Sequence, residues 1–328
     1  MLILNADEVR RAVPMGECIA AMKQAYAALS SGKVEMPLRT RLPVKRQEGL
    51  SIVMPAFVDD DRAEALAVKV VSVFSRNPAR GLPLIHAAVL VLNPETGEVE
   101  ALIEGSALTA IRTGAGCGAA TDVLARKDAQ RAAIFGAGVQ ARTQLQAICE
   151  VRQIETVWIY APNMQQVKQL VTQMAGCGKI PKDLRVAKDS KEAIQQADIV
   201  SAATTSVDPV FEDADLQPGS HVNGAGSYTA KMQEIPGQTV ARARVTVDSR
   251  SAAQIESGDI AIPLQKEKIS EADIAEIGEV ILGKASGRRS AEEITFFKSV
   301  GVAVQDALAG QLALTNARKM RLGVEVNW

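Results

Sequence analysis

The spacing of apolar positions changes near residue 128 and divides the chain into two parts. In the first part, residues 14–32 repeat apolar positions at helical spacing and end at a glycine, which predicts a helix. Apolar runs of strand length follow at residues 50–58, 65–74, 86–93 and 98–105. Turn residues at 93–98 join the last two runs as a hairpin. The first part therefore predicts an α+β region with a mostly antiparallel sheet.

The second part alternates strands and helices at the spacing of βαβ units, which predicts a parallel α/β sheet. Its predicted strands are residues 132–135, 156–163, 199–204, 221–226 and 245–249. From residue 304 to Arg318 the pattern is helical, and we expect this tail to return to the first part. The predicted domains are therefore 1–125 plus 305–328, and 126–304.

The composition is that of a folded, nearly neutral protein. The 328 residues correspond to about two domains, with 47% hydrophobic and 23% charged residues. The net charge of −1 is spread along the chain, so no patch for nucleic acid or an anionic membrane is expected. No apolar run reaches the roughly 18 residues of a membrane span. The expected partners are small molecules.

The four cysteines, Cys18, Cys117, Cys149 and Cys177, lack the paired spacing of a zinc site or a disulfide framework. We interpret them as buried free thiols and expect no metal. The N-terminal residues 1–13 have a short apolar run followed at once by charge, unlike a secretory signal. A cytoplasmic location is therefore expected.

The sequence "AAIFGAGVQA", residues 132–141, carries the strongest chemical signal. A strand runs into Gly136-Ala137-Gly138-Val139-Gln140-Ala141, a GxGxxA fingerprint that opens an amphipathic helix. Gly136 allows the tight turn, Gly138 the close approach of a pyrophosphate, and Ala141 the packing of helix on strand. Free N–H groups at the helix N-terminus would face the phosphates. This setting predicts a Rossmann dinucleotide-binding domain.

The cofactor is expected to be NADP(H) or NAD(H). About twenty residues after the fingerprint, an acidic residue would bind the ribose of NAD. Here the second strand ends in Ala161, Pro162 and Asn163. The missing carboxylate removes repulsion of a 2′-phosphate, although no arginine is there to hold one. The position slightly favours NADP(H).

Cations in apolar surroundings form the second chemical signal. Arg39 and Arg41 lie in "MPLRTRLPV", Lys69 in the middle of an apolar strand, and Arg112 among small residues. A buried cation is costly unless a carboxylate or phosphate pairs with it, so either an internal acid or an anionic substrate is needed. Several such cations beside a cofactor domain favour an anionic substrate. Arginine suits a carboxylate, and lysine can also transfer a proton.

Five segments, "MPLRT", "KVVSVFSRNPARGLP", "LTAIRTGAG", "FGAGVQA" and "FFKSVGVAVQD", in this order, resemble the ornithine cyclodeaminase and mu-crystallin family. The resemblance covers nearly the whole chain. It implies a Rossmann domain (126–304) inserted in an α+β substrate-binding and dimerisation domain (1–125 plus 305–328). It also implies binding of NAD(H) or NADP(H), action on amino or imino acids, and a homodimer.

The resemblance further implies roles for single residues. Arg39 and Arg112 match arginines that bind the substrate carboxylate, and Lys69 matches the active-site lysine. The positions that match cofactor contacts are Thr113, Gly136, Gly138, Val139, Gln140, Ala202, Thr204, Ser299, Val300 and Gly301, with Ala161 and Asn163 at the ribose. Arg41, His86 and Ser227 are further candidate substrate contacts.

One departure from the family pattern concerns Ser227. Cyclodeaminases and archaeal alanine dehydrogenases of the family carry an aspartate there, which serves the amine chemistry, whereas ketimine-reductase-like members resemble this chain in having serine. A serine cannot act as a carboxylate base at neutral pH. His86 matches a histidine of the same members, whereas His221 is interpreted as structural.

These features predict an NAD(P)H-dependent reductase of cyclic imino acids, such as 1-pyrroline-2-carboxylate and 1-piperideine-2-carboxylate, that forms L-amino acids such as proline. Three alternatives stay open: an ornithine or lysine cyclodeaminase that releases ammonia with catalytic NAD, an alanine-dehydrogenase-like enzyme, and a non-enzymatic crystallin-like binder. In the tail, "KSVGVAVQDALAG" at 298–310 has the appearance of an opening helix. We expect Gly301 to allow close approach to the nicotinamide, and we assign Asp306 no catalytic role.

Overall fold

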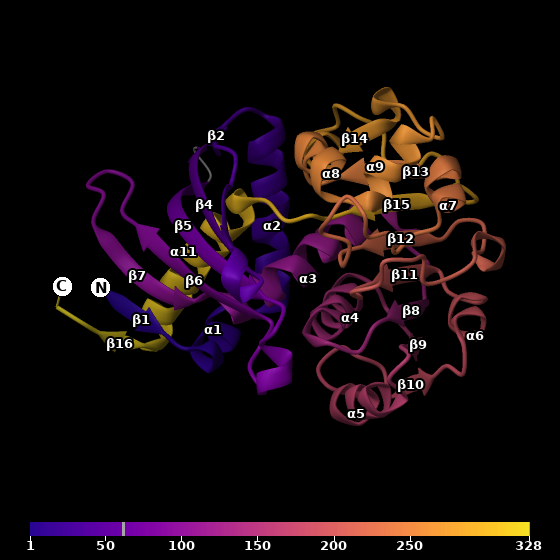
Figure 1. Ribbon diagram of the computed structural model, residues 1–328, viewed down its shortest axis with the longest axis horizontal. Coiled ribbons are helices and arrows are strands. Elements are labelled where there is room, and N and C mark those ends of the chain that lie inside the picture. Colours follow the sequence, from indigo (N-terminus) through magenta and orange to yellow (C-terminus); the bar gives the residue numbers. More distant parts are fainter. Residues whose placement is uncertain (61–62, 328) are drawn as a thin grey trace. The chain divides into compact units, whose positions relative to one another are not determined.

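The computed structural model describes residues 1–60 and 63–327. The chain forms two compact units: unit 1 comprises Met1–Arg112 and Ala303–Trp328, and unit 2 comprises Thr113–Val302 (Figure 1). The predicted domain limits, after residues 125 and 304, lie further along the chain than the observed divisions after Arg112 and Val302. The difference arises because helix α3 (Gly105–Leu124) runs unbroken through residue 112, so the first division has no linker that a sequence pattern could reveal.

Unit 1 is an eight-stranded sheet with helices. Its strands are β1 (Leu2–Leu4), β2 (Val34–Glu35), β3 (Thr40–Val44), β4 (Gly49–Asp60), β5 (Ala63–Phe74), β6 (Ile85–Leu92), β7 (Val99–Glu104) and β16 (Val324–Glu325). Its helices are α1 (Ala6–Ala12), α2 (Met15–Ser30), α11 (Ala303–Met320), the start of α3, and the short 3-10 turns η1 (Lys45–Gln47) and η2 (Pro78–Arg80). The sheet order is β16-β1-β7-β6-β5-β4-β2, with β3 also paired to β4.

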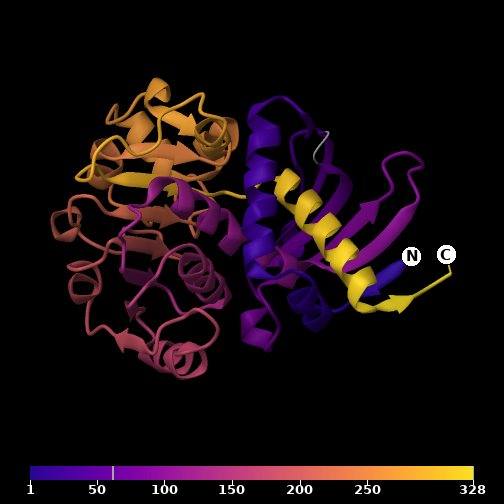
Figure 2. The same ribbon diagram turned by 180° about the vertical axis from the view of Figure 1, so that it is seen from behind.

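Strands β4 to β7 are antiparallel neighbours, as predicted. Alternation along β5 separates its two faces: Ala65, Ala67 and Lys69 are buried, whereas Val70 is exposed. Helix α11 packs beside α2 and against the central strands (Figure 2). At Gly310 of α11 an added Cβ would lie only 2.9 Å from a methyl group of Val91, so glycine permits the close approach of helix to sheet.

Unit 2 is an eight-stranded, fully parallel sheet. Its strands are β8 (Arg131–Phe135), β9 (Thr156–Tyr160), β10 (Asp183–Val186), β11 (Ile199–Ala202), β12 (His221–Gly224), β13 (Arg244–Val247), β14 (Ile274–Glu276) and β15 (Thr295–Lys298). Its remaining helical elements are α4 (Val139–Val151), α5 (Met164–Met174), α6 (Ser190–Ile194), α7 (Gly237–Arg242), α8 (Arg250–Glu256), α9 (Gly258–Gln265), α10 (Ile277–Ile281), η3 (Asp213–Asp215) and η4 (Glu271–Asp273).

The strand order in unit 2 is β10-β9-β8-β11-β12-β15-β13-β14. The first five positions follow the 3-2-1-4-5 order of dinucleotide-binding sheets. Successive residues of β8 belong to different apolar clusters: Ala133 and Phe135 pack in one, Ala132 and Ile134 in the other. The sheet is therefore buried on both faces, as parallel sheets are. Connections leave β8 and β11 in opposite directions, which places a topological switch point between them.

Two sequence predictions need correction. Lys298 ends strand β15 and does not open a helix, because α11 begins only at Ala303. Strand β15 has four residues and no alternation of polar and apolar positions, so its pattern was too short to recognise. Cys177 is exposed, whereas the other three cysteines are buried free thiols as predicted. Among the described residues, no helix combines the length and apolarity that a membrane crossing requires.

Candidate functional site

Lys69 lies in the middle of β5, between Met54 of β4 and Val89 of β6. It is on the face of the sheet that α11 covers, and only 2% of its surface is exposed. Its Nζ donates to Oδ2 of Asp306, on α11, at 2.5 Å. The lysine predicted from an apolar strand is thus a buried cation with a buried internal partner.

Arg112 joins the same carboxylate from α3. Its Nε donates to Oδ1 of Asp306 at 3.0 Å, and Nη1 donates to Oε1 of Gln305 at 3.0 Å. The Gln305 amide in turn donates to the hydroxyl of Tyr26, on α2, at 2.8 Å. Two predicted site residues, Lys69 and Arg112, therefore meet on one aspartate. We call Lys69, Arg112, Asp306, Gln305 and Tyr26 the unit 1 cluster.

The charges of the unit 1 cluster tune its acid–base chemistry. Burial lowers the pKa of Lys69 to about 8, with Asp306 opposing this shift and Arg112 and Arg39 adding to it. Burial opposes ionisation of Asp306, but Arg112 and Lys69 hold the pKa of this carboxyl below its usual value. An amine with a pKa near 8 can donate a proton at neutral pH.

Arg41 lies on the same face of the sheet as Lys69, and Arg39 lies near Lys69. Arg41 pairs with Ile52 of β4, and Ile52 pairs with Val71, two residues from Lys69. Arg39 directly precedes β3 and is near enough to lower the pKa of Lys69. Arg41 is exposed. The face of the sheet that carries Lys69 therefore also carries the cation of Arg41.

The structure does not bring His86 to this cluster. His86 pairs with Ser72, three residues from Lys69, so it occupies the opposite face of the sheet. Its side chain is exposed. The predicted substrate contact would thus have to be made from the other side of unit 1.

In unit 2, the fingerprint forms the turn that its glycines predicted. Gly136 follows β8 with φ of +111°, and an added Cβ would lie 2.6 Å from the carbonyl oxygen of Ala203, just after β11. Gly138 is the N-cap of α4, and an added Cβ there would meet no atom within 4 Å. Ala141 is buried against the sheet. The open space before α4 fits a pyrophosphate that approaches the backbone at Gly138, with the exposed Val139 and the half-buried Gln140 opening the helix.

Thr113 is buried on α3. The next residue, Gly114, packs so closely on α4 that an added Cβ would lie 2.5 Å from the carbonyl oxygen of Thr143. Thr113 is therefore adjacent in sequence to a backbone contact with the first turns of α4. Its position near the phosphates stays a prediction.

At the end of β9, Ala161 is buried and Asn163 is exposed. The Asn163 side chain caps α5 by accepting from the amide of Gln166 at 3.2 Å. Strand β9 is the neighbour of β8, where the ribose of a dinucleotide would lie. This end of β9 has the small, uncharged lining that the sequence predicted.

Two loops at the carboxyl edge of the unit 2 sheet meet on Glu234. Beyond β11, which ends at Ala202, the amide and hydroxyl of Thr204 donate to Oε1 at 2.6 and 2.8 Å. Beyond β12, the amides of Gly226 and Ser227 donate to Oε2 at 2.5 and 2.9 Å. Burial raises the pKa of Glu234, with Lys298 opposing this shift, whereas the four donors stabilise the ionised form.

The Ser227 side chain is directed into unit 2. Its hydroxyl donates to the carbonyl oxygen of Met232 at 2.6 Å and lies 3.1 Å from Oγ of Ser257, and the residue is fully buried. The structure therefore gives the hydroxyl internal partners. A role in substrate binding would depend on its backbone or on the shape of its loop.

The segment Ser299–Gly301 is shaped by Asp248, just after β13. Oδ2 of Asp248 accepts from the Ser299 hydroxyl at 3.1 Å and from the amides of Val300 and Gly301 at 2.9 and 2.7 Å. Gly301 has φ of +79°, which a side chain would strain. The predicted nicotinamide segment is thus a fixed turn at the end of β15.

Beneath these loops lies a second buried group of charges, Lys298, Asp259 and Glu234, which we call the unit 2 cluster. Nζ of Lys298 lies 3.2 Å from Oδ2 of Asp259, and both side chains are fully buried. Oδ1 of Asp259 accepts from the amides of Glu234 and Ile235 at 2.7 and 3.0 Å. Sequence reasoning gave these residues no role because they lie far apart in the chain, although the apolar neighbours of Lys298 were a local sign of its burial.

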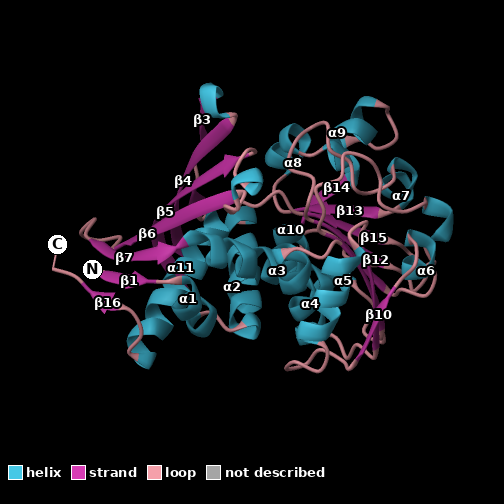
Figure 3. Ribbon diagram, turned by 60° about the horizontal axis from the view of Figure 1, so that its bottom comes forward, coloured by secondary structure: helices cyan, strands magenta, loops and turns pink. Residues whose placement is uncertain are grey.

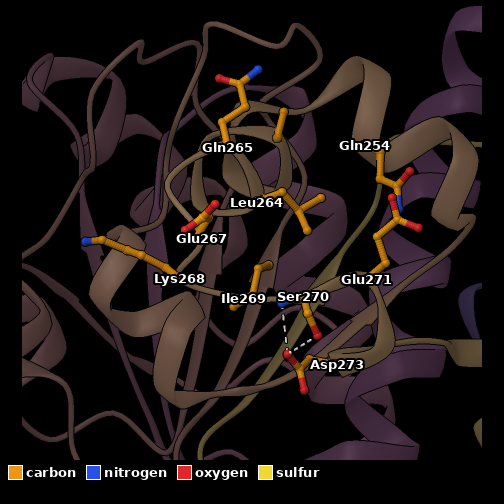
Figure 4. A pocket seen from close by; sticks show the side chains of 10 residues that line it. Gln254, Leu264, Gln265, Glu267, Lys268, Ile269, Ser270, Glu271 and Asp273 are labelled. Carbon is orange, nitrogen blue, oxygen red and sulfur yellow. Dashed lines mark hydrogen bonds between the residues drawn. The ribbon is translucent and has the colours of Figure 1, made fainter.

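Two further features lie in unit 2. His221 is buried, its ring nitrogens contact Thr295 and Asn223, and burial lowers its pKa to about 3, which agrees with a structural role. Figure 4 shows a pocket on α8, α9 and the segment after them, where Asp273 accepts from Ser270. None of the predicted site residues lines it. Among residues 1–60 and 63–327, no group of side chains suits a metal ion.

Comparison with known proteins gives consistent matches. The model of the ornithine cyclodeaminase/mu-crystallin family matches residues 1–320. A Delta(1)-pyrroline-2-carboxylate reductase of Bacillus cereus is 38% identical over 330 residues, covering 100% of both chains. The structure of Thermococcus litoralis Delta(1)-pyrroline-2-carboxylate reductase in complex with NADH and L-proline has a TM-score of 0.94 and 39% identity, over 99% of this chain and 100% of that one.

An archaeal alanine dehydrogenase dimer with bound NAD has a TM-score of 0.92 and 31% identity, over 100% of this chain and 99% of that one. The resemblance stated from the five segments and the predicted α/β fold class are therefore confirmed. The predicted reductase activity agrees with the activity that the Bacillus and Thermococcus relatives carry in their names.

Proposed function

Because the chain belongs to the ornithine cyclodeaminase/mu-crystallin family, we propose that it is an NAD(P)H-dependent reductase of cyclic imino acids that forms L-proline or its six-membered homologue. The observation that carries the proposal is the unit 1 cluster, in which a lysine and an arginine share one buried aspartate. The full-length similarity to two pyrroline-2-carboxylate reductases supports it.

The cations of unit 1 would bind the substrate carboxylate. Arg112 and Lys69 share the single charge of Asp306, and Arg39 lies nearby. The carboxylate of a bound substrate would balance the positive charge that Asp306 leaves uncompensated on Lys69 and Arg112. A guanidinium binds it in a fixed geometry, so the ring is oriented as well as held.

Lys69 would supply the proton. Reduction of a C=N bond adds a hydride to carbon and a proton to nitrogen, so an acid is needed beside the nitrogen. When bound, the reduced nicotinamide supplies the hydride. Lys69, with a pKa of about 8, is an ammonium at neutral pH and can donate directly or through a water.

Unit 2 is the proposed dinucleotide-binding domain. The solved relatives contain NADH and NAD. At the end of β9 this chain offers neither a carboxylate to repel a 2′-phosphate nor a cation to bind it, so Ala161 is the sole basis for a slight preference for NADPH. We expect both cofactors to bind within about tenfold in affinity, measured by titration of their fluorescence.

Unit 1 is also the proposed dimerisation domain, with a second copy as the partner. Helix α11 packs against the sheet of unit 1 (Figure 3). Its Asp306 accepts from Lys69, so α11 covers the face that carries Lys69. On the opposite face Val53 and Val70 pair with each other and are 36% and 39% exposed, and Leu42 is 63% exposed. The related alanine dehydrogenase is a dimer. A charged side chain introduced into this apolar patch would oppose burial of the patch in a dimer interface.

Light scattering tests the dimer. We expect the wild type to have the mass of two chains. The Val70→Glu variant should dissociate into single chains at protein concentrations at which the wild type is still a dimer. Leu282→Glu, at a residue of unit 2 that is 40% exposed, is the matched control and should remain dimeric. A monomeric wild type would refute the proposed assembly.

An amino-acid dehydrogenase is the second candidate, favoured by the similarity to alanine dehydrogenase. Such an enzyme would need pyruvate and free ammonia. Oxidation of NADH and NADPH should be followed with pyrroline-2-carboxylate, piperideine-2-carboxylate, and pyruvate plus ammonia. We expect turnover with the cyclic substrates; turnover only with pyruvate plus ammonia would replace the proposal by the second candidate.

A further inference from the structure

We propose that Asp306 is the positioning residue of unit 1, which holds Lys69 in its charged form and fixes the direction of Arg112. The inference rests on the proposed function, because it concerns how that reaction obtains its proton and orients its substrate. Asp306 does so through other residues and need not touch the substrate itself.

The two carboxylate oxygens of Asp306 bind different side chains. Oδ2 accepts from Nζ of Lys69, and Oδ1 accepts from Nε of Arg112. One carboxylate on a helix therefore fixes two side chains that come from a strand and from another helix. All three side chains are buried, so solvent cannot replace the aspartate as a partner.

The charge balance explains why an acid is needed here. The charged groups that act on Lys69 are Asp306 from α11, Arg112 from α3 and Arg39 from the segment before β3. Two of these three are cations, and burial also disfavours the ammonium form. Asp306 is the one group in this set that favours the protonated lysine. Without its charge, the pKa of Lys69 would fall further, and less of the lysine would be protonated at neutral pH.

Gln305 and Tyr26 complete the positioning of Arg112. The guanidinium of Arg112 can only donate, so the Gln305 amide turns its oxygen to Nη1, and its nitrogen then donates to the Tyr26 hydroxyl. If the Gln305 amide were flipped, its NH₂ group would face the N–H donors of Arg112, and neither group could accept a hydrogen bond. Tyr26, on α2, therefore anchors the far end of the glutamine, which in turn helps to direct the guanidinium.

The decisive experiment compares the pH dependence of kcat/KM for pyrroline-2-carboxylate in wild type and Asp306→Asn. The substitution keeps the shape and removes the charge. We expect the alkaline limb to move to lower pH by about one unit or more, which is tenfold in the fraction of protonated amine. Part of the lost activity should return when the pH is lowered, and the affinity for NADH should remain unchanged.

Asp306→Glu is the conservative control, with the charge retained. It should keep the wild-type alkaline limb even if its kcat is lower. Tyr26→Phe should raise KM with little effect on that limb, since it acts through Arg112. These two variants test the proposal even where Asp306→Asn fails to fold, because a shifted limb in the glutamate variant would also refute it.

A folded Asp306→Asn variant with the wild-type pH profile would overturn the inference and leave the proposed function intact. A wild type that reduces neither cyclic imino acid would instead overturn the proposed function. The two failures are therefore distinguishable. In a Lys69→Ala background, Asp306→Asn should add little further loss, because the two residues act as one unit; full additivity would contradict the proposal.

Discussion

Each unit of the molecule buries a lysine against an aspartate, but the two clusters have opposite balances of charge. In unit 1, Lys69 and Arg112 share one acid, Asp306. In unit 2, Lys298 is placed with two acids, Asp259 and Glu234. The first cluster has a cation in excess, and the second an anion in excess.

The partners of the excess charge distinguish the two clusters. The excess negative charge of unit 2 is satisfied internally, because backbone amides of three segments donate to Asp259 and Glu234. The excess positive charge of unit 1 has no such set of internal acceptors around Lys69 among the described residues. A buried cation in this position calls for an external anion, whereas the buried acids of unit 2 hold loops in place.

Lys69→Ala should have the largest effect on activity. A positioned general acid contributes about 10²–10⁴-fold, so kcat should fall by that range. Asp306 keeps Arg112 as its partner, so the cost in the free energy of unfolding should come mainly from the cavity that the buried side chain leaves, about 2–5 kcal/mol. Steady-state kinetics and urea unfolding measure the two effects, with Lys45→Ala on the surface as control. Normal reduction of pyrroline-2-carboxylate by the variant would refute the role of Lys69.

Lys298→Met should act mainly on stability. It removes the cation beside Asp259 and leaves buried acids uncompensated, which should cost about 3–5 kcal/mol in the free energy of unfolding. Urea unfolding measures this cost, and Lys266→Met, at an exposed residue of the same unit, is the matched control. A fully stable variant would show that the two clusters do not differ in the way described.

Glu234→Gln should have a moderate effect on cofactor binding. Its new NH₂ group would face the donors of Thr204 or of Gly226 and Ser227 and release one loop. We expect NADH affinity to fall about tenfold, equivalent to about 1.4 kcal/mol. Fluorescence titration measures it, with exposed Glu271→Gln as control. Unchanged affinity would separate these loops from the cofactor.

The smallest expected effect is the dependence of kcat on pH in the wild-type protein. Burial holds the pKa of Lys69 at about 8, so its acid form dominates below that value and is lost above it. The kcat for imine reduction should therefore decline as the pH rises through about 8. A rate that stays constant from pH 7 to pH 10 would show that Lys69 is not the proton donor.

Local patterns were sufficient for much of the fold and for part of the site. The GxGxxA turn needs only neighbouring residues, and Lys69 stood out because an apolar strand surrounds it. Asp306 could not be assigned, since its partner Lys69 lies 237 residues away and only the packing of α11 on β5 joins them. The inward direction of Ser227 likewise depends on Met232 and Ser257, whose approach no sequence pattern indicates.

The most direct test of the central claim is the product balance of the wild-type enzyme with pyrroline-2-carboxylate. We predict one L-proline formed for each NADH or NADPH oxidised, with no ammonia released. Absence of cofactor oxidation, or release of ammonia from ornithine without added reductant, would contradict the assignment of a cyclic imino acid reductase.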